Sequence, residues 1–245
     1  MCYGAAMPKE TYQYLTLREE RQDLVAITKG IAEYAKKVRA QNIVLVDRAA
    51  RPLATALLEY WKIVDPAGDH PRIYFLNPDG FSQKRLGISF FGSGARIVGL
   101  DIGVERVPHT LDMQREMGNR FKEGYQELYA ARMSPTIIFD TCAHTGGTLA
   151  AMVAALKKLG FSSLKVGVAS QEGDLGQGNV QIDFSFDKIR KCSTCAPFGK
   201  DSGVRKRSDI SCEPLPRSPK GVAAHRHAVG LRKEIRTVVS RLVKK

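Results

Sequence analysis

Short apolar runs alternate with amphipathic segments along the first 170 residues. Runs rich in Val, Ile and Leu are typical of strands buried on both faces of a sheet. They occur at residues 42–47, 72–78, 95–103, 135–140 and 163–170. Helical spacing of apolar residues predicts intervening helices over about 17–38, 48–62, 110–132 and 147–160. Strands that alternate with crossover helices predict an α/β fold, with a mostly parallel, twisted sheet flanked by helices.

Local signals refine these elements. Thr16 and Glu19 form a candidate capping box for the first helix, and Gly160 is expected to close the helix that starts near residue 147. Trp61 lies on a helix face with Leu57 and Leu58, which predicts a core position.

Residues 136–148 read TIIFDTCAHTGGT and join a predicted strand to a predicted helix. In a parallel sheet, ligands bind beyond the carboxyl ends of the strands. A helix that opens on Thr-Gly-Gly-Thr offers backbone N–H groups to a phosphate, and its glycines permit close approach. Asp140 stands upstream, within reach of the hydroxyls of an attached sugar, directly or through a metal-bound water. A phosphate cradle with a carboxylate at this distance indicates a sugar-phosphate site. The loop is neither a Walker A loop nor a G-x-G-x-x-G loop.

This run resembles the PRPP-binding motif of type I phosphoribosyltransferases, in which apolar residues, two acids and a short variable stretch precede Thr-Gly-Gly-Thr. The resemblance implies that Asp140 contacts the ribose hydroxyls and that residues 143–148 hold the 5′-phosphate. The implied PRPP and phosphate contacts are Asp140, Thr141, Ala143, His144, Thr145, Gly146, Gly147 and Thr148.

The earlier stretch VLVDRAARPLA, residues 44–54, falls where this family has its pyrophosphate loop. By that resemblance, Arg48 and Arg51 face the diphosphate, with the backbone amides of Ala49 and Ala50 beside them. Mg²⁺ is expected to bind together with PRPP.

Two positions depart from the family pattern. Thr141 stands where the family commonly has a second acid, so one carboxylate expected near the ribose and the metal is missing. His144 replaces an aspartate that is proposed as the general base of purine-salvage members. A neutral imidazole can accept a proton near pH 7, so His144 is a candidate catalytic residue, although a loop histidine can also have no role. Asp140, through its implied contact with the ribose, is the other candidate catalytic residue.

Three functions fit these residues. The first is a phosphoribosyltransferase that transfers phosphoribosyl from PRPP to a nitrogenous base and releases pyrophosphate. The second is a catalytically weak or inactive regulator, or a nucleic-acid-associated protein, that keeps the fold to bind PRPP or a nucleoside monophosphate. The third is a sugar-phosphate binder of similar topology. The glycine-rich segment 79–94, with Lys84 and Arg85, is either a lid over the diphosphate or an ordinary surface connection.

The formal net charge of +13 is concentrated near the end of the chain. Residues 1–187 hold 22 Lys and Arg against 21 Asp and Glu, whereas residues 188–245 hold 16 against 4. We therefore expect a phosphoribosyltransferase-like domain over 1–187 and a basic, cysteine-containing extension over 188–245. Such an extension is expected either to bind nucleic acid or to act as a solubilising tail.

The extension contains a C-x-x-C pair, Cys192 and Cys195, followed by Cys212 and by His225. These four residues are a candidate Zn²⁺ site, with free thiols as the alternative. Leu231, Ile235, Val238 and Leu242 lie on one face of a final basic helix, which we expect to dock on its own domain, while its cations remain available for phosphate contacts.

Two further expectations concern the acceptor and the setting of the protein. Phe184 and Phe186 either stack on an acceptor base or belong to a half-exposed strand, and the alternation VQIDFSFD favours the strand. No apolar run approaches the roughly 18–20 residues of a membrane span, and the odd cysteine count argues against a disulfide framework. We therefore expect a cytoplasmic protein that does not contact membranes. We also expect the protein to form a homo-oligomer.

Overall fold

The computed structural model describes residues 12–46, 50–77, 111–143, 146–171, 180–186, 204–206, 212–214 and 218–244. Its centre is a five-stranded sheet in the order β2-β1-β3-β4-β5, in which every neighbouring pair is parallel. The strands are β1 (Asn42–Val46), β2 (Arg72–Leu76), β3 (Thr136–Ala143), β4 (Leu164–Gln171) and β5 (Phe184–Ser185). The predicted parallel α/β sheet is confirmed.

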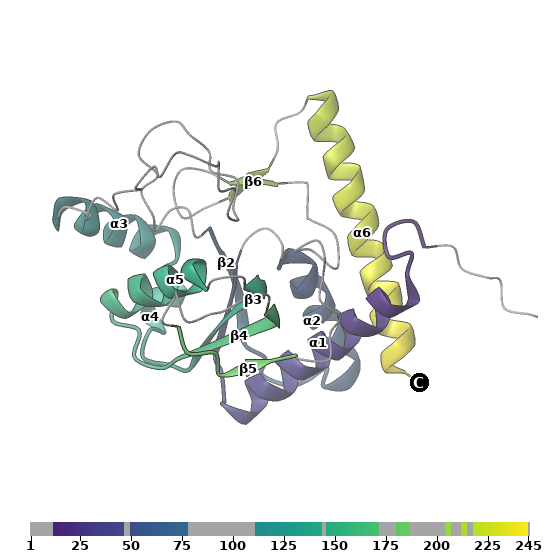
Figure 1. Cartoon of the computed structure of the whole chain (residues 1–245), viewed down its shortest axis with the longest axis horizontal. Helices are drawn as coiled ribbons and strands as arrows, with labels where there is room; N and C mark the ends of the chain where they lie inside the picture. Colours follow the sequence, from purple (N-terminus) through teal and green to yellow (C-terminus); the bar gives the residue numbers. More distant parts are fainter. Residues whose placement is uncertain are drawn as a thin grey trace, which may run out of the picture.

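Helices cover both faces of this sheet (Figure 1). On one face, α1 (Arg18–Lys37), α2 (Arg51–Val64) and α6 (Pro219–Val243) enclose a core with Ile43, Leu45, Ile137 and Phe139. On the other face, α3 (Leu111–Gly124), α4 (Gln126–Ala130) and α5 (Gly147–Lys158) enclose a core with Val44, Val46 and Ile138. Consecutive residues of β1 and β3 thus enter opposite cores, which explains why residues 43–46 and 137–139 are apolar without alternation.

Two elements differ from the sequence expectation at their ends. The helix expected over 110–132 is divided at Tyr125, which has a non-helical φ of −134° and whose hydroxyl donates to the Phe75 carbonyl at 2.8 Å. The first helix begins at Arg18 rather than at a Thr16 cap, because Glu20 reaches back to accept from the Leu17 N–H at 3.3 Å. The predicted strand 95–103 and the segment 79–94, with Lys84 and Arg85, lie outside the described residues.

The aromatic residues near the end of the sheet belong to the core. Phe184 stacks on Tyr34 with ring centroids 4.0 Å apart, and both Phe184 and Phe186 pack against the first core. A Cβ at Gly30 would collide with the Phe186 ring, so glycine is needed where α1 approaches this ring. The strand interpretation of this segment is confirmed for Phe184 and Ser185, and Trp61 is buried as expected.

Asp183 fastens the last strand to β4. Its carboxylate accepts from the Lys165 ammonium at 3.0 Å and from the Val166 N–H at 2.8 Å. The hydrogen bond that Lys165 donates to the Asp183 carboxylate raises the pKa of Lys165 above its ordinary value. β5 is therefore held by side-chain contacts as well as by its short ladder to β4.

The final helix docks by its apolar face, as expected. Leu231, Ile235 and Val238 are at most 2% exposed and join the core formed with α1 and α2. Upstream of this helix, β6 (Val204–Lys206) and β7 (Cys212–Pro214) pair with each other as an antiparallel, two-stranded sheet. None of the helices in the described part of the chain is long and apolar enough to cross a bilayer.

Glu234 joins α6 to the segment that precedes α1. Its carboxylate accepts from the backbone N–H groups of Gln13, Tyr14 and Leu15 at 2.6, 2.9 and 3.0 Å. Tyr14 also lies edge-on to His227, with ring centroids 4.8 Å apart. One side chain of α6 thus satisfies three amides that are about 220 positions away in the sequence.

Replacing Glu234 with alanine is expected to lower the free energy of unfolding by about 2 kcal/mol, because two partly buried amides and one exposed amide lose a charged acceptor. Urea unfolding measures this change. Glu33→Ala is the matched control, since Glu33 forms an exposed pair with Lys29 at 3.8 Å and its loss should cost well under 1 kcal/mol. Equal losses in the two variants would contradict the role of Glu234.

Candidate functional site

The carboxyl ends of β1 and β3 lie side by side at one edge of the sheet. Leu45 pairs with Phe139, so Val46 and Asp140 are the next residues of the two strands toward that edge. α2 begins at Arg51, shortly after β1, and α5 begins at Gly147, shortly after β3. These helices pack on opposite faces of the sheet, so two helix N-termini flank the same edge.

The connection from β3 to α5 is short. β3 runs to Ala143, three residues beyond the predicted end, because its ladder with β4 continues through Cys142↔Ser170 and Ala143↔Gln171. Gly146, the residue preceding α5, has a φ of +71°. This left-handed conformation favours glycine, and glycine offers no side chain to cap the helix. The first turn of α5 also contains no acidic residue, so its backbone presents a positive end to this edge.

Asp140 lies on the central strand of the sheet, where it pairs with Val168 of β4. Its side chain is half-buried, and Oδ1 accepts from the Thr141 N–H at 2.7 Å. This hydrogen bond restricts the orientation of the carboxylate. Asp140 thus provides a carboxylate oxygen, which can accept hydrogen bonds or bind a metal ion, upstream of the helix that follows Gly146.

Thr141 faces the interior and is 1% exposed. Its hydroxyl oxygen is buried and has no hydrogen-bond partner among the described residues. The position at which the resemblance leads us to expect a second carboxylate is therefore enclosed by the protein. Ser170, on β4, lies close by and donates weakly to the Thr141 carbonyl at 3.5 Å.

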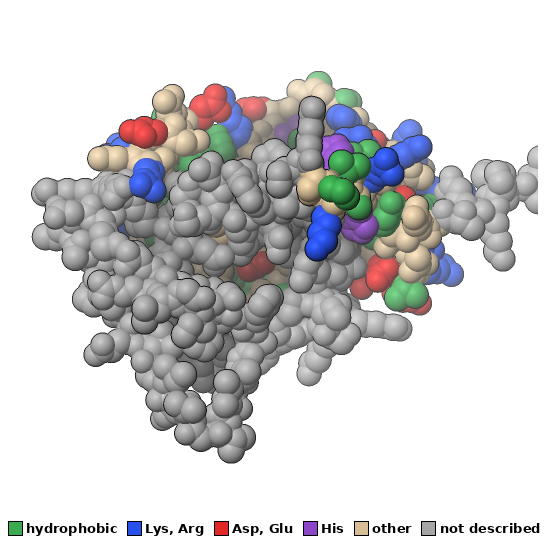
Figure 2. Space-filling model, turned by 90° about the horizontal axis from the view of Figure 1, so that it is seen from above, with side chains coloured by type: hydrophobic (Ala, Val, Ile, Leu, Met, Phe, Trp, Pro, Cys, Tyr) green, Lys and Arg blue, Asp and Glu red, His purple; other side chains and the backbone are tan. Residues whose placement is uncertain are grey.

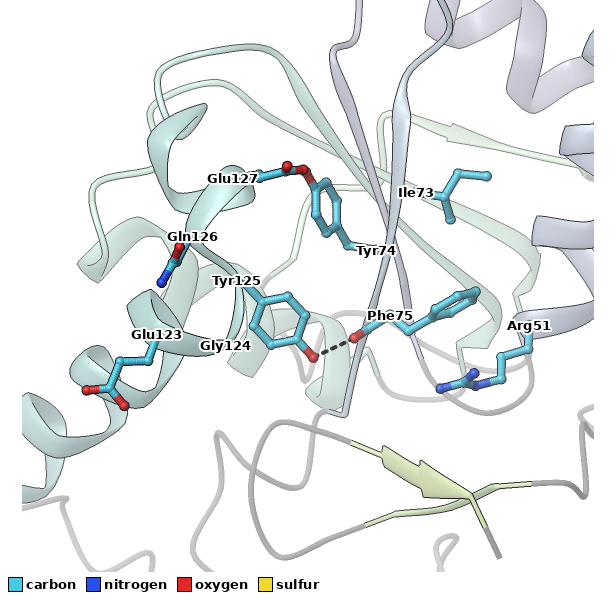
Figure 3. Close-up of a pocket in the computed structure, with 9 residues that line it drawn as sticks. All are labelled: Arg51, Ile73, Tyr74, Phe75, Glu123, Gly124, Tyr125, Gln126 and Glu127. Carbon is cyan, nitrogen blue, oxygen red and sulfur yellow. Dashed lines mark hydrogen bonds between the residues drawn. The ribbon is translucent and has the colours of Figure 1, made fainter.

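Arg51 lies at the start of α2, and its guanidinium carbon is 4.4 Å from the centre of the Phe75 ring (Figure 3). Stacking uses the face of the guanidinium, whereas anions bind to the N–H groups at its rim. Arg51 borders a hollow of about 490 Å³ along β2, together with Tyr125 and Glu127. Because β1 separates β2 from β3, this hollow is adjacent to the Asp140 edge and is not centred on it. Phe75 carried no functional signal in the sequence, since RIYFL reads as an ordinary strand.

The structure thus describes part of each expected loop. Asp140, Thr141 and Ala143 are in β3, whereas Gly146, Gly147 and Thr148 form the start of α5. Ala50 and Arg51 form the start of α2. His144, Thr145, Arg48 and Ala49 lie outside the described residues. Cys142 is half-buried within β3 rather than in a loop.

The candidate zinc ligands are distributed differently. Cys192 and Cys195 lie outside the described residues, Cys212 belongs to β7, and His225 is exposed on α6. Within the described ranges, no group of three or more His, Cys, Asp or Glu side chains could hold a metal ion.

No family model matches the sequence, and no curated protein matches it. Solved structures that are similar to the chain include three phosphoribosyltransferases. The purine phosphoribosyltransferase of Pyrococcus horikoshii is 16% identical, with coverage of 67% of this chain and 81% of that one and a TM-score of 0.37. A hypoxanthine phosphoribosyltransferase of Staphylococcus aureus is 14% identical, with coverage of 68% and 72% and a TM-score of 0.37.

The third structure is the hypoxanthine phosphoribosyltransferase of Trypanosoma cruzi in complex with the product IMP. It is 13% identical, with coverage of 86% of this chain and 91% of that one and a TM-score of 0.37. All three proteins are named as phosphoribosyltransferases.

Replacing Thr141 with valine is expected to raise the free energy of unfolding by about 1 kcal/mol, because it removes a buried hydroxyl that lacks a partner. Thr28→Val is the matched control, since Thr28 is equally buried but donates to the Leu24 carbonyl at 2.6 Å. The control should lose about 1 kcal/mol. Chemical denaturation measures the free energy of unfolding of both variants. Destabilisation by Thr141→Val as well as by Thr28→Val would contradict a Thr141 hydroxyl that lacks a partner.

Proposed function

We propose that the chain binds PRPP or a nucleoside monophosphate and transfers the phosphoribosyl group to a nitrogenous base, with release of pyrophosphate. One observation carries this proposal. A carboxylate in the carboxyl-terminal half of the central strand, Asp140, precedes a helix whose N-cap is a left-handed glycine, at the carboxyl edge of a parallel sheet.

The 5′-phosphate would bind at the start of α5. Backbone N–H groups and the helix dipole attract a phosphate there, and Gly146 and Gly147 permit close approach. Thr148 is exposed in the first turn, where its hydroxyl can donate to the same phosphate. In this proposal, Thr145 and His144 complete the loop.

The ribose hydroxyls would bind to Asp140. A carboxylate accepts two hydroxyl donors well, and the Thr141 N–H orients this one. Asp140 also fits Mg²⁺, which binds hard oxygen ligands and commonly uses one or two carboxylates together with substrate phosphates. When bound, Mg²⁺ would neutralise charge on the departing diphosphate.

In the transfer itself, a ring nitrogen of the base forms a bond to C1 of PRPP while the bond from C1 to the diphosphate oxygen breaks. The diphosphate leaves with the electron pair, and the proton on the attacking nitrogen passes to a base, for which His144 is the candidate. Arg48 and Arg51 would bind the diphosphate, with the amides of Ala49 and Ala50.

A second function is binding of the same ligands without turnover, as in a nucleotide-responsive regulator. The burial of Thr141 favours it, because the second carboxylate expected near the ribose and metal is replaced by an enclosed hydroxyl. Incubation with PRPP, Mg²⁺ and a panel of bases separates the two functions. Nucleotide and pyrophosphate formation supports transfer, whereas tight PRPP binding without product for any base supports the regulator.

The zinc site of Cys192, Cys195, Cys212 and His225 remains a separate proposal. Four such ligands suit a tetrahedral structural site. Metal content measured on the purified protein tests it, and Cys195→Ser should abolish any stoichiometric zinc.

Replacing Gly146 with alanine is expected to weaken PRPP affinity by about tenfold, because the helix start must shift away from its left-handed geometry and from the phosphate. Gly160→Ala is a matched control. Gly160 also has a positive φ, +89°, but it follows the far end of α5. Both variants should lose about 1–2 kcal/mol of stability. Calorimetric titration measures the PRPP affinity of both variants, and only Gly146→Ala should bind PRPP more weakly. Equal PRPP affinities of the two variants would argue against a phosphate loop at Gly146.

Replacing Asp140 with asparagine is expected to weaken binding of nucleoside monophosphate about tenfold and to leave the affinity for inorganic phosphate unchanged, since only the ribose contacts lose a charge. Thermal-shift titrations with both ligands measure this difference. Asp69→Asn, at an exposed position beside the opposite end of β2, is the control. A parallel loss of phosphate binding in Asp140→Asn would contradict the division of roles.

A further inference from the structure

The outer face of α6 is strongly basic. The helix carries six Lys and Arg residues against a single acid, Glu234. That acid is bound by three backbone amides of the N-terminal segment, so its charge is directed away from the outer face. The excess positive charge of α6 is therefore not balanced within the helix.

The cations form a stripe opposite the buried face. At about 100° per residue, Arg226, Lys233 and Lys244 fall within about 20° of one line along the helix, and Arg241 falls beside them. Leu231, Ile235 and Val238 project from the other side into the core. Arg226, Lys233 and Lys244 are exposed. Figure 2, viewed from above, shows cationic and histidine side chains gathered where α6 begins.

Part of this surface is hollowed. Arg236, Thr237, Ser240 and Arg241 border a shallow depression of about 420 Å³ near the end of the helix. The Ser240 hydroxyl donates to Glu59 at 2.8 Å, and the Thr237 hydroxyl donates to the Lys233 carbonyl at 3.2 Å. Glu59 in turn lies 4.0 Å from Lys62, so a cation accompanies this acid. Two arginines, Arg236 and Arg241, thus border this depression.

We propose that the outer face of α6 binds the phosphate backbone of double-stranded nucleic acid without reading its sequence. From Arg226 to Lys244 the stripe spans about 27 Å, which corresponds to about eight base pairs of a duplex. Lys and Arg along such a stripe can contact phosphates that are several nucleotides apart, and each contact releases condensed counterions. The proposal goes beyond phosphoribosyl transfer and does not depend on it, because α6 contributes no residue to the Asp140 edge.

Other polyanions fit this face less well. Helices that bind membranes insert their apolar side, but the apolar side of α6 is used by the core of the protein. Single-stranded nucleic acids are held largely by base stacking on aromatic side chains, and α6 has none of Phe, Tyr and Trp. Phosphate contacts along a duplex require only the exposed cations.

The test uses the full chain and labelled, mixed-sequence DNA and RNA duplexes of about 20 base pairs at several salt concentrations. The variant Arg226→Gln/Lys233→Gln/Lys244→Gln removes three charges of the stripe. The matched control Lys122→Gln/Lys157→Gln/Lys158→Gln removes three exposed charges from helices on the other face of the sheet. Circular dichroism melts verify that both variants are folded.

We expect the wild type to bind at least one duplex with strong salt dependence. The stripe variant should bind at least about tenfold more weakly, and its slope of log K against log salt should be smaller by about two to three. The control variant should retain the duplex affinity and the salt slope of the wild type. Unchanged binding in the stripe variant, an equal loss in the control, or binding to anionic lipid vesicles in place of duplexes overturns the proposal. Phosphoribosyl transfer measured on the same variants reports separately on the proposed enzyme.

Discussion

The burial of β3 on both faces determines where polar chemistry can occur in this chain. Ile137, Ile138 and Phe139 are completely buried, alternating between two cores that are closed by different helices. Neutral polar side chains are buried in these strands where they pair, as Asn42 of β1 does with Thr136 of β3 at 3.2 Å, whereas a charge there would lose its hydration without a counter-charge. Asp140 is the first charged residue of β3, and it appears only where the strand reaches the open edge. The same parallel arrangement brings the starts of α2 and α5 to this edge, so the candidate site follows from the sheet.

The basic extension takes part in this core through α6. Leu231, Ile235 and Val239 close the face that α1 and α2 leave incomplete, while Glu234 and Gly230 hold the segment before α1. At Gly230 a Cβ would meet the Tyr14 ring, so the close approach of this segment depends on glycine. The apolar side of α6 therefore packs in the central core, whereas its other side carries the basic residues of the extension.

Periodicity predicted the strands that are buried on both faces, because their composition is determined locally. It failed where a non-local partner decides the structure. β3 continues past Asp140 because β4 supplies hydrogen-bonding partners for Cys142 and Ala143, and neither residue is a strong strand former. The interruption at Tyr125 depends on the Phe75 carbonyl of β2. In the candidate site, the roles of Asp140 and of the glycines could be predicted from the motif. The burial of Thr141 and the contact of Arg51 with the Phe75 ring could not.

The threonine at position 141 has a physical explanation in its surroundings. A carboxylate enclosed at this position would need charged partners or hydrogen-bond donors, and the threonine hydroxyl finds no partner among the described residues. A β-branched side chain suits the strand and has a much smaller desolvation cost than a charge. The contact that orients Asp140 comes from the backbone N–H of Thr141 and not from its side chain. Loss of the second acid therefore leaves the orientation of the first intact, so that ribose recognition in the proposed site can persist even where catalysis is weakened.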